Sequence, residues 1–223
     1  MLLVILIRKI FNKEGLRSFL ISYDIRALKL FLRGLLLGVL FFIIYVFIIV
    51  FLNQGQLIIE LENWRRTAII FFAYGGSFLI AALFEEFLYR GYILQKLLKK
   101  VSPHYAVIIT SIIFGLGHYN SYLHNGYSLT LGIINSVMIS VILSIIVIRT
   151  ESLLFVIGWH FSWNLTQSLF LLEGNKMFSL LFKRENILTG SRFVPESGLL
   201  VSFVIFLFFI FINYYDYKPF LLV

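Results

Sequence analysis

Long apolar runs, several of them close to the length of a membrane span, dominate the chain. A transmembrane helix needs about 20 mostly apolar residues. The stretches that qualify are Phe31–Leu52, Thr67–Leu88, Tyr105–Tyr119, Leu129–Ile148, Leu153–Leu172 and Leu199–Tyr214. A basic, amphipathic stretch, Arg8–Arg33, precedes them and is expected to lie at the membrane surface. The pattern predicts an all-α protein, a polytopic transmembrane helical bundle of about six spans plus an N-terminal amphipathic segment.

Composition supports the membrane interpretation. Apolar types make up 60% of the 223 residues and charged types 13%, whereas a soluble domain has about 45–50% and about 25%. A disordered protein, a fibrous rod and a disulfide-stapled secreted domain are excluded, the last because the chain has no cysteine. The net charge of +8 is what basic cytoplasmic loops produce. No soluble basic face is long enough for nucleic acid, so the expected surroundings are the lipid bilayer.

The distribution of basic residues predicts the orientation. If successive loops alternate between the two sides, most Lys and Arg residues fall on the side of both termini, which are therefore expected in the cytoplasm. No repeat or linker divides the chain. We therefore expect one membrane domain, 1–223, with a motif-bearing core at about 67–172. Richness in Ile, Phe, Lys and Asn suggests a bacterium with an AT-rich genome, and hence a bacterial cell membrane.

Two adjacent carboxylates lie within the second apolar stretch. A charge at the centre of a span costs about 2.5–3.5 kcal/mol on insertion scales, so Glu85 and Glu86 call for an explanation. Glu86 and Arg90 are four residues apart on one helix face and can form an ion pair. This pair is equally consistent with an interfacial structural role and with a functional one. Glu85 is turned about 100° away and must find its partner on another helix.

Two histidines in apolar surroundings are candidates for that partner. The turn at Ser102-Pro103 has Glu85 17 residues before it and His118 16 residues after it. In an antiparallel hairpin these equal arms place both residues about 25 Å from the turn. His160 lies about 15 Å past the next turn, near Thr150, and reaches the same level if the first hairpin protrudes by about 10 Å.

The equal arms also make the second helix longer than a membrane is thick. From Thr67 to about Lys99 it would measure about 50 Å, against a hydrocarbon core of about 30 Å. Either this helix protrudes into the cytosol or it is broken near Gly75-Gly76. Polar residues of the fourth stretch are interpreted as helix-packing residues. These are Asn135, Ser136, Ser140 and Ser144.

Three short motifs, in order, resemble the signature of the CPBP family of intramembrane proteases. That family includes CAAX prenyl protease 2, bacteriocin-processing enzymes and proteins like lysostaphin resistance protein A, and its pattern is EExxxR, FxxxH and HxxxN. The corresponding residues here are Glu85-Glu86…Arg90, Phe114…His118 and His160…Asn164. The segment Val194-Pro195-Glu196-Ser197-Gly198 loosely resembles a Gly- and Glu-containing segment of bacterial members.

The resemblance implies an intramembrane endopeptidase that hydrolyses peptides or lipid-anchored and membrane proteins. It assigns the catalytic roles to Glu85, His118, His160 and Asn164, and supporting roles to Glu86 and Arg90. The chemistry is consistent with these residue types. A carboxylate in a low-dielectric cavity is a stronger base for water, and His and Asn side chains can donate hydrogen bonds to an oxyanion.

The sequence leaves the question of a metal open. Glu85, His118 and His160 are suitable zinc ligands, and family members are commonly labelled metalloproteases. The tight HExxH helix is missing, however, and a metal-free mechanism uses the same residues. Zinc is therefore the one cofactor that the sequence brings into question.

Two other functions compete with proteolysis. A non-catalytic bacteriocin-immunity or membrane-binding protein could share the fold, but the intact set of motif residues favours an enzyme. A small transporter could use the Glu and His cluster as a proton relay, yet the repeats or paired broken helices typical of transporters are not recognisable in the sequence.

Overall fold

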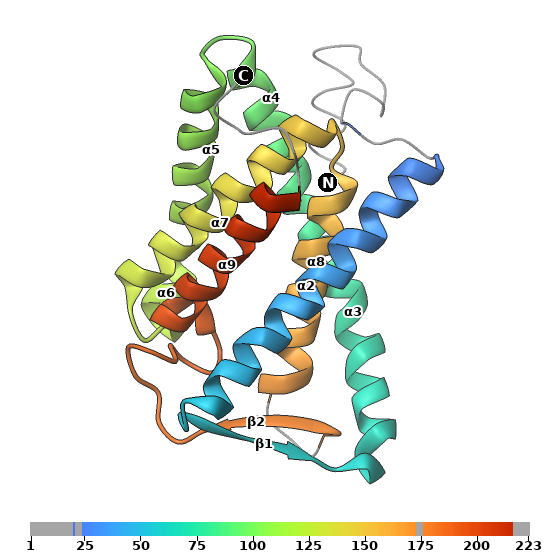
Figure 1. Cartoon of the computed structure of the whole chain (residues 1–223), viewed down its shortest axis with the longest axis vertical. Helices are drawn as coiled ribbons and strands as arrows, with labels where there is room; N and C mark the ends of the chain where they lie inside the picture. The colour runs from blue at the N-terminus through green and yellow to red at the C-terminus, as the bar shows by residue number, and fades with distance from the viewer. Residues whose placement is uncertain (1–19, 21–23, 173–175, 216–223) are drawn as a thin grey trace.

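The computed structural model describes Leu20, residues 24–172 and residues 176–215. Figure 1 shows a bundle of helices with a small sheet across one end. The principal elements in chain order are α2 (Ile25–Phe51), β1 (Gly55–Ile59), α3 (Trp64–Glu86), the π-helical segment η3 (Phe87–Leu94), α4 (Gln95–Leu98), α5 (Pro103–Gly117), α6 (Tyr119–Asn125), α7 (Leu129–Thr150), α8 (Leu154–Leu171), β2 (Phe178–Phe182), the 3-10 turn η4 (Pro195–Ser197) and α9 (Leu199–Tyr215). A helix occupies each of the six apolar stretches, so the all-α class is confirmed.

Among the described residues, fewer helices than expected are long and apolar enough to cross a membrane on their own. By length and composition, spans are possible at Ile25–Phe51, Leu61–Leu98 and Leu129–Thr150, and a fourth if the bent pair of α5 and α6 is one span. Helix α8 is as long as a short span, but it directs several polar side chains into a cavity, which lowers its hydropathy. Most of the amphipathic stretch Arg8–Arg33 and the last residues of the chain lie outside the described residues.

Helices α2 and α8 cross at close range because glycines line the contact. A Cβ atom on Gly34 would lie 2.0 Å from the carbonyl oxygen of Phe155, and one on Gly38 would lie 2.1 Å from Ser162 Oγ. Gly158 on α8 faces the backbone of α2 in the same way. Small residues four apart let two helix backbones approach inside a membrane. This contact fixes the position of α8, which carries two of the expected site residues.

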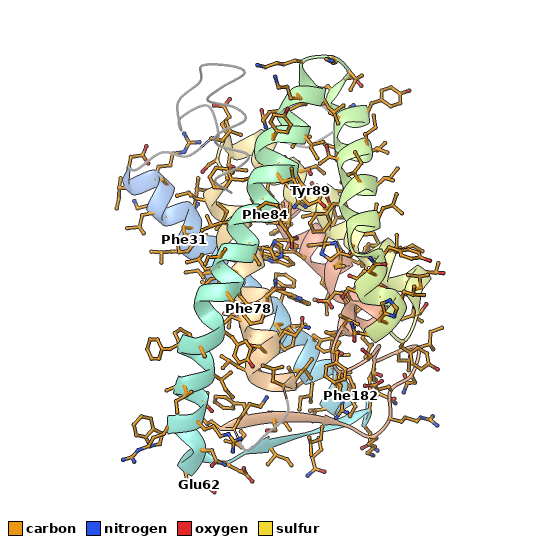
Figure 2. All side chains as sticks on the ribbon, turned by 180° about the vertical axis from the view of Figure 1, so that it is seen from behind. Phe31, Glu62, Phe78, Phe84, Tyr89 and Phe182 are labelled. Atoms are coloured by element: carbon orange, nitrogen blue, oxygen red, sulfur yellow. The ribbon has the colours of Figure 1, made fainter. Side chains whose placement is uncertain are left out.

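Helix α3 runs without interruption through Gly75-Gly76, so the expected alternative of a break there is wrong. Its α-helical turns end at Glu86 and continue as the π-helical segment η3. Cβ atoms added at Gly75 or Gly76 would meet nothing within 4 Å, because the first half of α3 stands away from the other helices. Figure 2 shows this helix along one side of the bundle, with Glu62 just before its start and Tyr89 beyond its other end, in the π-helical segment.

A two-stranded sheet, which the sequence analysis did not predict, covers the end of the bundle opposite the Ser102-Pro103 turn (Figure 1). Strands β1 and β2 are antiparallel, and their register runs from Gly55↔Phe182 to Ile59↔Phe178. Each strand has only five residues, too few to stand out from the neighbouring apolar helices. The sheet joins the loop after α2 to the loop after α8, and so lies next to the base of α8.

Candidate active site

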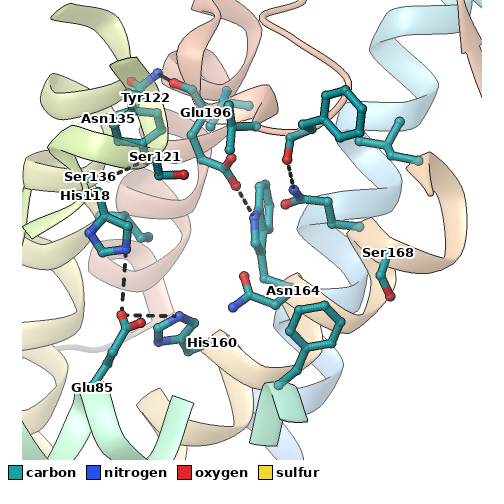
Figure 3. Close-up of a pocket in the computed structure, with 18 of the residues that line it drawn as sticks. Glu85, His118, Ser121, Tyr122, Asn135, Ser136, His160, Asn164, Ser168 and Glu196 are labelled. Atoms are coloured by element: carbon teal, nitrogen blue, oxygen red, sulfur yellow. Dashed lines mark hydrogen bonds and ion pairs between the residues drawn. The ribbon is translucent and has the colours of Figure 1, made fainter. Parts of the chain in front are cut away.

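The four expected catalytic residues come from three parts of the fold and line one cavity of about 370 Å³. Glu85 lies in the last turn of α3, directly before the π-helical segment, and His118 lies at the junction of α5 and α6. His160 and Asn164 are one turn apart on α8. π-Helical turns are frequent at functional sites because they rotate side chains away from the regular helix face. Figure 3 shows Glu85, His118 and His160 converging on one side of the cavity.

Glu85 lies between the two histidines; the hairpin arithmetic predicted that it can face His118, and left the approach of His160 conditional on a protruding hairpin. Its Oε2 atom is 3.7 Å from His118 Nε2 and 3.9 Å from His160 Nε2. Both distances exceed hydrogen-bond length. This oxygen is buried and has no hydrogen-bond partner within the part of the chain that the structure describes. A buried acceptor without a partner, facing two ring nitrogens, is the arrangement expected where a water or a substrate group binds.

The Nδ1 atom of each imidazole ring forms a hydrogen bond. This bond determines whether Nε2 of the same ring acts as a donor or as an acceptor. His118 Nδ1 lies 3.0 Å from the carbonyl oxygen of Phe114, which can only accept, so Nδ1 carries a hydrogen. His160 Nδ1 lies 2.8 Å from Glu86 Oε1 and donates to that carboxylate. When either ring is neutral, its Nε2 is therefore an acceptor that faces Glu85.

Glu86 forms the expected ion pair with Arg90 and also a contact that the sequence did not predict. Arg90 Nη1 lies 2.9 Å from Glu86 Oε1 and 3.0 Å from Oε2, and both side chains are fully buried. The additional contact is the hydrogen bond from His160. Glu86 therefore orients a site histidine as well as neutralising an arginine. His160 is 74 residues away, so helical spacing could not reveal it.

Phe114, the first residue of the FxxxH motif, packs between Arg90 and His118. The Arg90 guanidinium carbon lies 4.5 Å above its ring, and the His118 ring is 4.7 Å away between centroids. Arg90 Nε and Nη2 are buried without hydrogen-bond partners in the described residues, so the face of this aromatic ring is their main electrostatic compensation. Phe114 thus fixes Arg90 and His118 relative to each other.

One face of α8 supplies a wall of the cavity. Its lining residues recur at three- and four-residue steps, as one helix face requires. They are Trp159, His160, Trp163, Asn164, Gln167, Ser168 and Leu171. The Asn164 amide lines the same cavity as His160 (Figure 3). Within the described residues, no hydrogen bond ties this amide to another group, so it is available to a bound group.

Glu196 is a cavity residue to which the sequence analysis gave no role. It comes from η4, before α9, and its Oε1 accepts a hydrogen bond of 2.8 Å from Trp163 Nε1. Burial raises the pKa of the Glu196 carboxyl group above its ordinary value. A single acidic residue in a loop carries no periodic signal, and the only indication in the sequence was the loose resemblance of Val194–Gly198 to a family segment.

Asn135 holds this segment in place, which extends the packing role expected for it. Its side-chain nitrogen donates to the carbonyl oxygens of Glu196, at 2.7 Å, and Gly198, at 3.0 Å. Its oxygen accepts from Ser202 Oγ on α9 at 2.7 Å. Asn135 therefore joins α7 to α9 and also positions the loop that carries Glu196.

The three candidate zinc ligands lie slightly farther apart than the ligands of one bound zinc would. The tethered Nδ1 atoms and inward-facing Nε2 atoms resemble those of metal-binding histidines. Ligand atoms 2.0–2.2 Å from a tetrahedral zinc would be about 3.3–3.5 Å apart, whereas Glu85 Oε2 is 3.7 and 3.9 Å from the ring nitrogens. Across the described residues, no group of three His, Asp or Glu side chains has metal-binding geometry.

Comparison with known proteins gives one result. Residues 64–166 match the model of a family described as type II CAAX prenyl endopeptidase Rce1-like. The matched segment contains all three motifs and ends before β2 and Glu196. Searches of curated proteins and of solved structures returned no match. Residues 64–166 are therefore similar to an Rce1-like domain, and the three motifs within them are consistent with a protease of the CPBP family.

Proposed function

We propose that the protein is an intramembrane endopeptidase in which Glu85 activates a water molecule for attack on a peptide bond. The observation that carries this proposal is the buried Oε2 atom of Glu85, which has no hydrogen-bond partner in the described residues and faces the Nε2 atoms of His118 and His160. A general base must lie within reach of the water that it deprotonates. This gap is wide enough for a bridging water, since both distances exceed direct hydrogen-bond length.

His118 would orient the water. Its Nδ1–H is used by the Phe114 carbonyl, so the neutral ring offers the Nε2 lone pair. The water donates one hydrogen to His118 and the other to Glu85, and its oxygen lone pair points at the substrate carbonyl. Glu85 takes one proton as the oxygen–carbon bond forms, and later gives that proton to the departing amine. Atoms and charges balance, because one water is consumed and two new chain ends are formed.

His160 and Asn164 would stabilise the oxyanion. The Asn164 amide can donate in any protonation state. His160 Nε2 can donate only when the ring is an imidazolium, because its Nδ1 hydrogen is already engaged with Glu86. The Glu86 carboxylate favours that charged form. Donors aimed at a developing negative charge in a dry site are among the largest contributors to catalysis.

The proposed substrates are peptides or lipid-anchored and membrane proteins, in keeping with the family. We further propose that the protein lies in a bacterial cell membrane with both termini in the cytoplasm, as the distribution of its basic residues predicts. Every step of the proposed mechanism is carried by side chains of this chain and by water.

The test is a comparison of membrane peptides from cells that carry wild-type protein or Glu85→Gln. The substitution keeps the size of the side chain and removes the base, so we expect normal insertion and loss of specific cleavage products. Glu62→Gln, an identical change at an exposed position before α3, is the control and should behave as wild type. Near-wild-type cleavage by purified Glu85→Gln protein would contradict the proposal. An unchanged peptide profile in all three would favour a non-catalytic binding protein.

A further inference from the structure

A second cavity adjoins the proposed catalytic cavity at the C-terminal end of α8. It has a volume of about 640 Å³. Leu171, Leu172, Arg192 and Phe193 line both cavities, so the two spaces meet at these residues. Gln167 Nε2 donates to the Phe193 carbonyl oxygen at 3.1 Å, which ties the loop at this junction to α8. The second cavity lies outside the family match, which ends at residue 166.

Strand β2 forms one wall of the second cavity. Four consecutive residues, 179–182, line it. The hydrogen bonds from Glu60 N to Met177 O and from Lys183 N to Gln54 O mark the hydrogen-bonded pairs of the ladder. Hydrogen-bonded and non-hydrogen-bonded pairs alternate along an antiparallel ladder. The register therefore makes Ser179 and Leu181 the β2 residues that bond to β1.

The intervening β2 residues present their backbone groups on the other edge. The N–H and C=O groups of Phe178, Leu180 and Phe182 point away from β1. Within the described residues, no hydrogen bond joins these groups to another element. Leu180 is nevertheless 4% exposed, so bulk water does not readily replace a partner. A free strand edge, buried at its central residue and half-buried at the other two, is a template for pairing with another extended chain.

The distance between this edge and the catalytic carboxylate suits a short peptide. Leu171 and His160 are eleven residues apart on α8, or about 16 Å. An extended chain advances about 3.3 Å per residue, so about five residues would connect β2 to the scissile bond beside Glu85. Most of the residues that line the second cavity are apolar, and they include Phe170, Phe182 and Phe193.

We propose that an extended, apolar segment of the substrate pairs with the free edge of β2 as a third strand and leads the scissile bond to Glu85. This inference rests on the proposed function and adds to it the manner of substrate binding. Backbone hydrogen bonds to Phe178, Leu180 and Phe182 hold the segment, and the apolar walls receive its alternate side chains. A helical substrate must unwind over this stretch before it is cleaved.

Hydrogen exchange measures this pairing directly. The probe is a peptide that wild-type protein cleaves and Glu85→Gln does not, added to the Glu85→Gln protein in lipid nanodiscs. We expect slower exchange, by tenfold or more, at the amides of Phe178, Leu180 and Phe182. The matched control is the free edge of β1, where the amides of Leu57 and Ile59 should keep their exchange rates.

Backbone N-methylation of the same peptide supplies a second measurement. Methyl groups at alternate residues remove either the hydrogens that face β2 or those that face away, because strand residues alternate in direction. One set should weaken binding at least tenfold, and the set shifted by one residue should leave it nearly unchanged. If no peptide shows Glu85-dependent cleavage, both the proposed function and this docking mode are overturned. Cleavage without protection at β2, or with equal effects of both methylation sets, overturns the docking mode alone.

Discussion

The buried Glu86–Arg90 pair offers a sharp quantitative prediction through a double-mutant cycle. The substitutions are Glu86→Met and Arg90→Met, which replace each charge by an apolar chain of similar length. Glu86→Met leaves the Arg90 charge without its carboxylate, and Arg90→Met leaves Glu86 with only the hydrogen bond from His160, both at positions with no solvent exposure. Breaking a buried pair in this way costs about 3–5 kcal/mol of unfolding free energy, so additive behaviour would give a double-mutant loss of about 6–10 kcal/mol.

The expected loss in the double mutant is much smaller. With both charges gone, the remaining defect is His160, whose Nδ1–H loses its acceptor on Glu86. An unsatisfied buried donor costs about 1–3 kcal/mol, while replacing a buried ion pair by apolar residues is often neutral. The double mutant should therefore lose about 1–3 kcal/mol, and the coupling between the two positions should exceed about 3 kcal/mol.

Reversible unfolding of the purified protein in mixed micelles would measure the four free energies. Glu185 and Arg192 provide a control cycle, because Arg192 Nε and Glu185 Oε1 are 3.9 Å apart with side chains 49% and 41% exposed. Coupling in such an exposed pair should stay within about 1 kcal/mol. Losses at Glu86 and Arg90 that add to within about 0.5 kcal/mol would refute the reasoning, since the two charges would then not depend on each other.

Three further predictions follow from individual side chains. Asn164→Ala should lower turnover by about 10²–10³ without changing zinc content in elemental analysis; restoration of lost activity by one equivalent of zinc would instead support a metal site. Gly34→Ala should lower the free energy of unfolding by about 1–3 kcal/mol, because the new Cβ would lie 2.0 Å from the Phe155 carbonyl oxygen. Gly75→Ala is the control: its Cβ would meet nothing within 4 Å, so this change should stabilise α3. Burial raises the pKa of Glu196, so folding favours its protonated form and stability falls as pH rises above about 4.5. Glu196→Gln should therefore raise the melting temperature at pH 7 but not at pH 4, and an equal shift at both would contradict this.

Some contacts of the site can be predicted from the spacing of residues in the sequence. The Ser102-Pro103 turn and the equal arms on either side of it predicted that Glu85 and His118 would meet, and the two side chains lie 3.7 Å apart across the hairpin. This worked because helix rise is constant and proline sets the start of α5 at Pro103. The Glu86–Arg90 pair was equally predictable, since four-residue spacing on a helix determines its geometry.

Other features depend on contacts between segments far apart in the chain. The hydrogen bond from His160 to Glu86 joins α8 to α3 and decides which nitrogen of the ring faces the cavity. Glu196 reaches the cavity because Asn135 binds its carbonyl oxygen and that of Gly198. Neither residue carries a local pattern that indicates its partner. The sequence also gave no sign that α3 would change to π-helical turns directly after Glu86.

Taken alone, the sequence determined the helices, the membrane setting and the motif residues, because hydropathy and helical periodicity are properties of consecutive residues. Tertiary structure alone decided the pairing of β1 with β2, whose partners are more than a hundred residues apart. Five-residue strands leave almost no periodic signal, and their register depends on where α2 and α8 place their ends. The close crossing of those two helices at Gly34 and Gly38 is likewise a property of two surfaces that meet only in the folded chain.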